Sequence, residues 1–307
     1  MFPGQGSQYI GMGKEFYEQI PICKEVYDLA SEVTGLDIPA LCFEENEKIN
    51  ITEYTQICML ATEAAIYMAL EQNGYQPDVT AGLSLGEYGA LIASGVMTAE
   101  EAFELVRKRG IFMQEAVPAG GAMAAVLGLD AAAIEQICRD TAEQTASEVS
   151  IANYNCPGQI VITGPKPAVE EASVKLKEAG ARRVLSLAVS GPFHSSLLQN
   201  AGKELEKELS KVELSGLKIP YVTNVTAQYV TDISETKNLL ARQISSSVLW
   251  QQSVEKMIQE GVDTFVEIGP GKTLAGFMKK IAPEMKTYNI QNVEDLEQIS
   301  DLIHSRK

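Results

Sequence analysis

Ser84 stands between two glycines in the apolar run AGLSLGEYGAL, residues 81–91. The pattern Gly82-x-Ser84-x-Gly86 matches the nucleophile elbow, a sharp turn from a strand into a helix. Small residues on both sides let the backbone pass closely, so the serine hydroxyl is exposed at the tip of the turn. The pattern also fits an ordinary turn serine, so Ser84 is a candidate nucleophile that requires a base.

The sequence contains two histidines that could accept the proton of such a nucleophile. His304 lies in DLIHSRK near the end of the sequence, where a precise position is hard to maintain. His194 lies in SGPFHSSLL, where we expect Ser195 and Ser196 to cap a following helix. The positive end of that helix would disfavour the imidazolium form and keep the ring a free base. His194 is the predicted base; the alternative is a structural loop histidine.

Arg109 projects from the apolar face of a predicted helix that begins near residue 98. Its neighbours three and four positions away are all apolar: Leu105, Val106, Phe112 and Met113. A buried, unpaired charge is strongly destabilising, so the guanidinium group needs a partner from elsewhere. That partner is either an acidic residue distant in the sequence or the carboxylate of a substrate, which the planar guanidinium group can bind through two hydrogen bonds.

Two glycine-rich segments resemble phosphate-binding loops only superficially. PGQGSQ, residues 3–8, has one GxG and no strand–helix signature, so it is weak as a nucleotide cradle. As a tight turn it could instead present backbone N–H groups to an oxyanion. GPGKT, residues 269–273, imitates the end of a P-loop, but Val266 stands where that motif requires glycine. The sequence therefore excludes a P-loop.

Two further stretches have plain structural interpretations. NYNCPGQ, residues 153–159, is predicted to be a hairpin loop with Asn155 and Pro157 in its turn. The densest basic stretch between residues 121 and 189 is by default a solvated helix face; it contains Lys175, Lys177, Arg182 and Arg183.

The composition is that of an ordinary folded protein in a reducing compartment. Hydrophobic residues make up 45% of the 307 residues, and the net charge of −16 argues against a nucleic-acid or anionic-membrane surface. The five cysteines are widely spread without a CxxC pair, so we expect neither a disulfide framework nor a metal site. We find no apolar stretch of the roughly 18 residues that a membrane span needs, and no signal-peptide pattern. We expect a cytoplasmic protein.

Helical and strand periods alternate along the chain. Residues 51–74 form a long apolar pattern that predicts a buried helix, and VTAGLS at 79–84 predicts a strand that leads into Ser84. Thr98 and Glu101 form the signature of a capping box at the start of the helix that carries Arg109.

The middle of the chain has a different organisation. Residues 121–189 follow the order strand, helix, strand, strand, helix, strand, which is that of a ferredoxin-like (βαββαβ) unit. We predict an α/β fold in which this small subdomain is inserted into a large catalytic domain with a parallel-rich sheet, formed by residues 1–120 and 190–307.

Several segments together resemble the malonyl-CoA:acyl carrier protein transacylase family of bacterial fatty-acid synthesis. In chain order they are FPGQGSQ (2–8), GLSLGE (82–87), KRGIFMQEAVPAG (108–120), NYNCPGQIVITG (153–164), GPFHS (191–195), NVTA (224–227) and EIGPGKTL (267–274). The similarity spans almost the whole chain, and several such blocks in the expected order are far more specific than any single one.

The resemblance implies roles for the candidate residues. Ser84 would carry the acyl group, and His194 would be its base. Gln5 and the backbone N–H of Leu85 would form the oxyanion hole.

The resemblance also implies how the substrate and the base are held. Arg109 would bind the malonyl carboxylate, and Asn155 would belong to the same pocket. Gln243 would orient the histidine through a carbonyl oxygen, giving a dyad without a catalytic acid. The site would lie in a gorge between a hydrolase-like large domain and the ferredoxin-like insert.

The chain departs from the family pattern in two places. Leu83 precedes the candidate nucleophile where the family usually has histidine, so any contribution of that imidazole is absent. The sequence begins at Met1-Phe2-Pro3, whereas relatives carry several apolar residues before this motif. We therefore expect the first strand of the sheet to be short or missing.

The implied reaction is ping-pong transfer of a malonyl group from malonyl-CoA to the phosphopantetheine thiol of acyl carrier protein, through a malonyl-serine. Malonyl-CoA is a substrate and phosphopantetheine belongs to the partner, so no cofactor is expected. Carrier proteins of this kind are acidic, as is this chain. The local docking surface is therefore expected at Lys175, Lys177, Arg182 and Arg183.

Three alternatives remain open on the sequence. A stand-alone acyltransferase of a polyketide synthase shares the chemistry and differs in the carrier supplied. A serine thioesterase or esterase would use the same nucleophile, with an acid between Ser84 and His194. A non-enzymatic scaffold would retain the elbow in inactive form.

Overall fold

The computed structural model describes residues 1–116, 120–189 and 191–304. The first of these ranges is mostly helical: α1 (Lys14–Gln19), α2 (Pro21–Thr34), α3 (Ile38–Phe43), α4 (Thr52–Gln72), β1 (Thr80–Ala81), α5 (Gly86–Ala93) and α6 (Ala99–Glu115). Within the described residues, no helix has both the length and the apolar character that a bilayer crossing requires.

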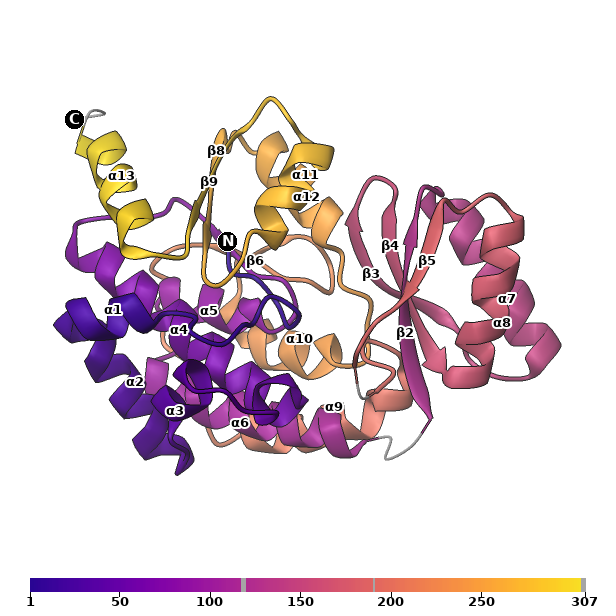
Figure 1. The fold of residues 1–307 in the computed structure, drawn as a ribbon, viewed down its shortest axis with the longest axis horizontal. Helices are drawn as coiled ribbons and strands as arrows, with labels where there is room; N and C mark the ends of the chain where they lie inside the picture. Colours follow the sequence, from indigo (N-terminus) through magenta and orange to yellow (C-terminus); the bar gives the residue numbers. More distant parts are fainter. Residues whose placement is uncertain (117–119, 190, 305–307) are drawn as a thin grey trace.

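Residues 191–304 pack with α1–α6 to form one body (Figure 1). It contains α9 (Gln199–Leu209), β6 (Tyr221–Val222), β7 (Tyr229–Val230), α10 (Thr236–Gln243), α11 (Trp250–Gln259), β8 (Thr264–Ile268), α12 (Thr273–Ile281), β9 (Lys286–Ile290) and α13 (Val293–His304). Short 3₁₀ turns cover Lys48–Asn50, Ser196–Leu198 and Ile233–Glu235.

Helix α4 lies at the centre of the helical layer. Almost all of its residues are buried, because it is apolar on more than one side and packs against α2, α5 and α6. The helix predicted over residues 51–74 is thus confirmed. The capping box that starts α6 is also confirmed, since the Thr98 side chain accepts from the Glu101 N–H and the Glu101 carboxylate accepts from the Thr98 N–H.

The strands of this body form two short sheets whose pairing is mostly parallel, as in the parallel-rich sheet that we predicted. One has the order β1-β6-β7, with β1 parallel to β6, and the other pairs β8 with β9 in parallel. Between them lies only the start of the chain, where Phe2 forms one parallel bridge to Gly82 and the Ile268 N–H donates to the Met1 carbonyl at 2.8 Å. In the described residues this segment forms an isolated bridge rather than a strand, which agrees with the expectation of a short or missing first strand.

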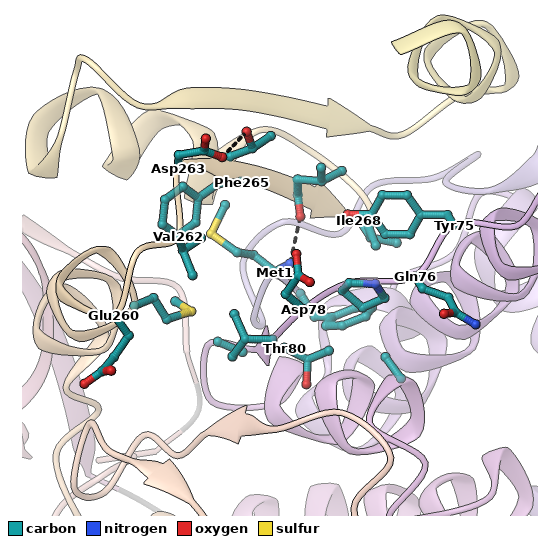
Figure 2. Close-up of a pocket in the computed structure, with 18 of the residues that line it drawn as sticks. Met1, Tyr75, Gln76, Asp78, Thr80, Glu260, Val262, Asp263, Phe265 and Ile268 are labelled. Carbon is teal, nitrogen blue, oxygen red and sulfur yellow. Dashed lines mark hydrogen bonds between the residues drawn. The ribbon is translucent and has the colours of Figure 1, made fainter. Parts of the chain in front are cut away.

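A cavity of about 1060 Å³ lies beside this start of the chain (Figure 2). Val79, Thr80, Val262 and Phe265 are among the residues that line it. The described residues that line this cavity do not include Ser84, His194 or Arg109. The candidate site therefore lies elsewhere in the fold.

The middle of the chain forms a separate four-stranded antiparallel sheet, the β2–β5 unit. Its elements are β2 (Gly121–Leu127), α7 (Ala131–Thr145), β3 (Ser150–Cys156), β4 (Gln159–Pro165), α8 (Lys166–Glu178) and β5 (Arg183–Ser186), with strand order β3-β4-β2-β5. Both helices cover the outer face of the sheet (Figure 1) and enclose a core of their own. The βαββαβ order is the predicted one.

One prediction within this unit is wrong. Asn155 is not in a turn, because β3 continues through Cys156 and the turn consists of Pro157 and Gly158. Gly158 supplies the positive φ of 70° that closes the hairpin, so no conformational demand falls on Asn155.

The β2–β5 unit is joined to the helical body through Val248. The Val248 N–H donates to the Ala152 carbonyl at 2.8 Å, and the Tyr154 N–H donates to the Val248 carbonyl at 2.9 Å. The segment just before Val248 contains Gln243, and the segment after β5 leads to His194. Gln243, the predicted partner of His194, therefore lies five positions before this junction.

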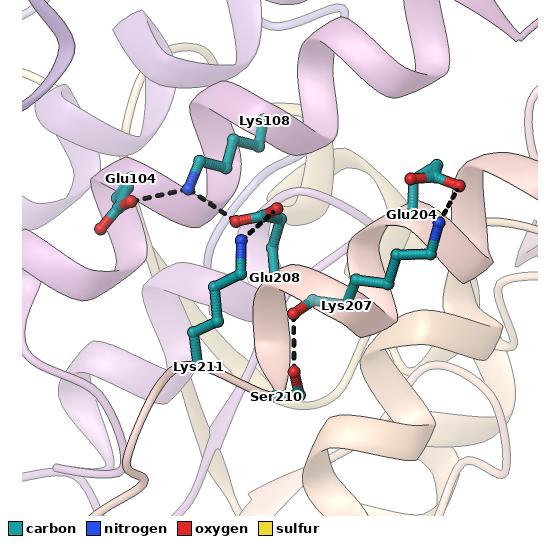
Figure 3. Close-up of polar contacts among 7 residues, drawn as sticks. All are labelled: Glu104, Lys108, Glu204, Lys207, Glu208, Ser210 and Lys211. Carbon is teal, nitrogen blue, oxygen red and sulfur yellow. Dashed lines mark hydrogen bonds and ion pairs between the residues drawn. The ribbon is translucent and has the colours of Figure 1, made fainter.

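Charged side chains join α6 and α9 at the surface (Figure 3). Lys108 contacts Glu104 at 2.6 Å and Glu208 at 2.7 Å, and Glu208 also pairs with Lys211 at 2.7 Å. The pair between Lys108 and Glu208, which joins the two helices, is partly buried. Lys108 is thus partly exposed while its neighbour Arg109 is fully buried, as the apolar pattern predicted.

Candidate active site

Ser84 lies in a tight turn between β1 and α5, with a positive φ of 53°. The two flanking glycines allow this turn, since a Cβ atom on Gly82 would lie 1.9 Å from the Gly86 carbonyl carbon. A Cβ atom on Gly86 would lie 2.2 Å from the Phe2 carbonyl oxygen. The local geometry is that of a nucleophile elbow, in which the serine backbone is strained and its side chain is only partly buried.

We predict that Gly82→Ala destabilises the fold, because its methyl group would overlap backbone atoms that cannot move aside. The expected loss in the free energy of unfolding is about 3 kcal/mol, at the upper end of the range for overpacking. Chemical denaturation measures it, with Gly276→Ala as the matched control, since a Cβ atom there meets nothing within 4 Å. Equal stability of the two variants would contradict this description of the elbow.

The Asn224 side chain stabilises the elbow through two hydrogen bonds to its backbone. Its Oδ1 accepts from the Ser84 N–H at 2.6 Å, and its Nδ2 donates to the Gly82 carbonyl at 2.6 Å. Asn224 is fully buried, so both bonds form away from water. The role of Asn224 was not predicted from the segment NVTA, because an elbow pattern does not reveal which distant residue supports it.

The candidate nucleophile and base meet directly. Ser84 Oγ lies 2.8 Å from His194 Nε2, and His194 Nδ1 lies 2.9 Å from the backbone carbonyl oxygen of Gln243. A carbonyl oxygen can only accept, so Nδ1 carries the proton and Nε2 presents a lone pair to the serine hydroxyl. The other histidine, His304, has a side chain outside the described residues.

His194 is almost completely buried, with 5% of its surface exposed. The pKa of its imidazole is lowered from 6.5 to about 4, mainly by burial and also by the neighbouring positive charge of Arg109, against hydrogen bonds that raise it. The free-base form is thus the one that we predicted, but for a different reason. Ser195 and Ser196 do not cap a helix here, since their hydroxyl groups bond to the Pro192 carbonyl and to Glu148.

This pKa predicts the acid side of the pH profile. We expect kcat/KM for acylation to stay constant from neutral pH down to about one unit above the His194 pKa, because the base is already unprotonated there. The folded-state pKa lies below that of the unfolded chain, so this residue reduces stability as the pH falls from 6.5 toward about 4. Initial rates, with folding monitored by circular dichroism at each pH, measure the profile. A loss of half the activity near the ordinary histidine pKa would contradict the prediction.

Arg109 is fully buried beside Ser84 and His194. The hydrogen bonds that the structure shows for its guanidinium group all go to neutral side chains. Its Nη1 donates to Gln56 Oε1 at 2.5 Å, and its Nη2 donates to Ser84 Oγ at 3.1 Å and to Gln243 Oε1 at 3.0 Å. Among the ion pairs of the described residues none includes Arg109, and its buried Nε has no hydrogen-bond partner. An acidic residue distant in sequence is therefore not its direct partner.

Gln243 connects the parts of the site. Its backbone oxygen meets His194, its side-chain oxygen accepts from Arg109, and its Nε2 donates to the Ser84 carbonyl at 3.0 Å and to Glu87 Oε2 at 2.6 Å. Sequence reasoning missed both Glu87 and Gln56. A glutamate in the first turn of an otherwise apolar, wholly buried helix was a signal that could have identified Glu87.

The other predicted site residues differ in whether they contact Ser84, His194 or Arg109. Leu85 is the N-cap of α5 and directly follows Ser84. The Gln5 side chain donates to Thr52 Oγ1 at 3.1 Å, at the start of α4. Asn155 is buried in β3. Within the described residues, the structure shows no hydrogen bond from Asn155 to Ser84, His194 or Arg109. Leu83 packs partly buried against apolar residues.

Comparison with known proteins agrees with this geometry. Residues 1–302 match the acyl transferase domain family. The chain belongs to that family. The malonyl CoA-acyl carrier protein transacylase of Bacillus subtilis (strain 168) is 46% identical to this acyl transferase over 299 residues, which cover 97% of this chain and 94% of the relative. That of Staphylococcus aureus (strain MRSA252) is 42% identical and 96% of each chain is covered.

Solved structures give the same assignment for the acyl transferase fold. MCAT from Streptococcus pneumoniae superposes with a TM-score of 0.93 at 45% identity, covering 98% of both chains. A malonyl-transacylase in complex with a type II PKS acyl-carrier protein superposes with a TM-score of 0.95 at 38% identity, again covering 98% of both. The family resemblance predicted from the sequence is thereby confirmed, as is its mixed α/β class.

Proposed function

We propose that this acyl transferase moves a malonyl group from malonyl-CoA to the phosphopantetheine thiol of an acyl carrier protein, through an ester on Ser84. The proposal is supported chiefly by one juxtaposition: Ser84 Oγ lies 2.8 Å from His194 Nε2 and 3.1 Å from Arg109 Nη2. The names of the relatives agree with the reaction. We infer that it supplies malonyl groups for fatty-acid elongation.

The first half-reaction loads the enzyme. His194 Nε2 accepts the proton of Ser84 as its Oγ attacks the thioester carbonyl carbon of malonyl-CoA, forming a tetrahedral oxyanion. The backbone N–H groups of Leu85 and Gln5 are the proposed donors to that oxyanion. When the intermediate collapses, the carbon–sulfur bond breaks and the CoA sulfur leaves with the proton from His194.

The second half-reaction is the reverse chemistry with a different thiol. His194 accepts the proton of the phosphopantetheine thiol, whose sulfur attacks the ester carbonyl carbon. Collapse of the second tetrahedral intermediate returns the proton to Ser84 Oγ and releases malonyl-carrier. No metal and no bound cofactor takes part in this proposal.

Arg109 is the proposed site of the malonyl carboxylate. In the free enzyme Arg109 Nη2 donates to Ser84 Oγ, and Arg109 Nε has no hydrogen-bond partner in the described structure. Once Ser84 is esterified, Nη2 can donate to the substrate instead, and Nε can do so without breaking an existing hydrogen bond. These two nitrogens are neighbouring donors of the guanidinium group, so a carboxylate can accept from both. Gln56 and Gln243 would hold the group in place meanwhile.

The hydrolase alternative is less well supported. A thioesterase or esterase of this type uses an acid to orient its histidine, whereas His194 Nδ1 bonds to the backbone oxygen of Gln243. A buried guanidinium group beside the nucleophile also has no purpose in such an enzyme. The two functions separate in one assay: malonyl-CoA and holo-carrier are supplied together, and malonyl-carrier and free malonate are quantified. Accumulation of malonate rather than malonyl-carrier would overturn the proposed transfer.

A polyketide synthase carrier is the second candidate acceptor, favoured by the structural neighbour bound to a type II PKS acyl-carrier protein. The chemistry at Ser84 would be the same. Competition between a fatty-acid carrier and a polyketide carrier for the malonyl-enzyme distinguishes them, since the preferred acceptor has the higher kcat/KM.

We also propose the division of the chain and the carrier surface given above. Residues 1–120 and 190–307 would be the hydrolase-like domain, and residues 121–189 the ferredoxin-like insert. On that insert Lys177, Arg182 and Arg183 are exposed, while Lys175 is partly buried and lies 3.4 Å from Glu171. We expect the three exposed cations to contribute most to carrier docking.

Charge reversal tests the docking surface. Changing Lys177, Arg182 and Arg183 to glutamate should slow transfer to the carrier and weaken its salt dependence, while loading from malonyl-CoA is unchanged. Lys207→Glu on α9 is the control, since Lys207 is equally exposed but lies outside the insert. An unchanged rate with the carrier would place docking elsewhere.

A further inference from the structure

Glu87 is a fully buried carboxyl group beneath the candidate site, in the first turn of α5. Its Oε2 accepts from Gln243 Nε2 at 2.6 Å and from the Asn224 N–H at 3.1 Å. One of these partners bonds to Arg109, and the other holds the elbow that carries Ser84. The mechanism proposed above uses neither Glu87 nor these two bonds.

We propose that Glu87 is a positioning residue that orients the Gln243 amide and, through it, the Arg109 guanidinium group. A carboxylate only accepts hydrogen bonds, so the NH₂ end of the Gln243 amide must face Glu87. The amide oxygen then faces Arg109 Nη2, at 3.0 Å. With the amide reversed, an NH₂ group would face the guanidinium donors and an oxygen would face the carboxylate, and both contacts would be repulsive.

The Gln243 amide also keeps Glu87 and Arg109 from pairing directly. It lies between the two side chains, with its oxygen toward Arg109 and its nitrogen toward Glu87. A direct pair with Glu87 would occupy donors that the substrate carboxylate needs. The intervening amide accepts one hydrogen bond from the guanidinium group and leaves its other donors available for substrate.

Two variants of Glu87 test the proposal, which rests on the proposed function. Glu87→Ala leaves Gln243 Nε2 without its acceptor, so kcat/KM with malonyl-CoA should fall about 100-fold, as expected when a binding group is misplaced. With acetyl-CoA, which lacks the carboxylate, the loss should be smaller than about fivefold, because the dyad remains bonded to the Gln243 backbone. Equal losses for the two substrates would overturn the proposal.

Glu87→Gln supplies the conservative rescue. Its amide oxygen can accept from Gln243 and Asn224, while its NH₂ group can donate to the Thr223 hydroxyl that lies beside the carboxyl group. Activity with malonyl-CoA should therefore return to within about fivefold of the original. A Glu87→Gln variant as impaired as Glu87→Ala would show that positioning through this acceptor is not the role. Glu63→Gln is the control, since Glu63 is an equally buried carboxyl group that bonds to none of these residues in the described structure.

A double-mutant cycle gives a second readout that does not depend on catalysis. If Glu87 acts through Gln243, the changes in unfolding midpoint caused by Glu87→Ala and Gln243→Ala should not add in the double variant. Additive changes would contradict the proposal. If the unmodified enzyme forms no malonyl ester, the proposed function is wrong, and this cycle still decides whether Glu87 holds Gln243.

Discussion

Arg109→Met should lower kcat/KM for malonyl-CoA by about 10³-fold, because removing one member of a desolvated charge pair leaves the other unpaired. Methionine keeps much of the apolar stem and removes the charge. Acetyl-CoA presents no carboxylate, so its rate should change by less than about tenfold. The preference of the enzyme for malonyl over acetyl groups should therefore largely disappear.

Single-turnover acylation with each thioester measures this selectivity. Arg109→Lys is the informative companion variant, since an ammonium group keeps the charge but cannot reproduce the planar set of donors to Gln56, Gln243 and the substrate. It should recover part of the malonyl rate. Losses of equal size for malonyl-CoA and acetyl-CoA would instead make Arg109 a structural arginine.

His194→Ala should slow acylation of Ser84 by about 10³-fold, within the usual range for a general base. The imidazole is the group that the structure places 2.8 Å from Ser84 Oγ to accept its proton, and this variant removes it. The remaining rate should rise with pH, because solvent base then performs this step. The unmodified enzyme should not show this rise, since its base is already unprotonated at neutral pH.

Rapid-quench measurement of the acyl-enzyme gives the His194→Ala rate directly. Ser195→Ala is the matched control, since its hydroxyl bonds to the Pro192 carbonyl and makes no contact with Ser84. That variant should load at close to the original rate. A His194→Ala enzyme that loads as fast as the control would remove His194 from the mechanism.

The sequence predicts best those features that depend on neighbouring residues. The buried α4, the capping box of α6 and the elbow at Ser84 follow from apolar periodicity, local side-chain bonds and glycine spacing. The burial of Arg109 follows in the same way from the residues one turn away. In each case the information lies within a few positions of the chain.

Contacts between distant segments could not be predicted in this way. Asn224 lies 140 positions from Ser84, and Gln243 lies 156 positions from Glu87, so no local pattern connects them. The low pKa of His194 was expected from a helix end, but it results from burial and from Arg109, which only the folded chain supplies. The division of the strands into two short sheets could not be predicted either, because pairing between distant strands depends on the whole fold.

The most direct test is the mass and position of a covalent adduct. After brief exposure to malonyl-CoA and acid quenching, intact-mass measurement should show one added malonyl group, and peptide sequencing should place it on Ser84. The Ser84→Ala variant should remain unmodified, and addition of holo-carrier should remove the adduct from the unmodified enzyme. An adduct that persists in Ser84→Ala, or a folded enzyme that never acquires one, would contradict the account.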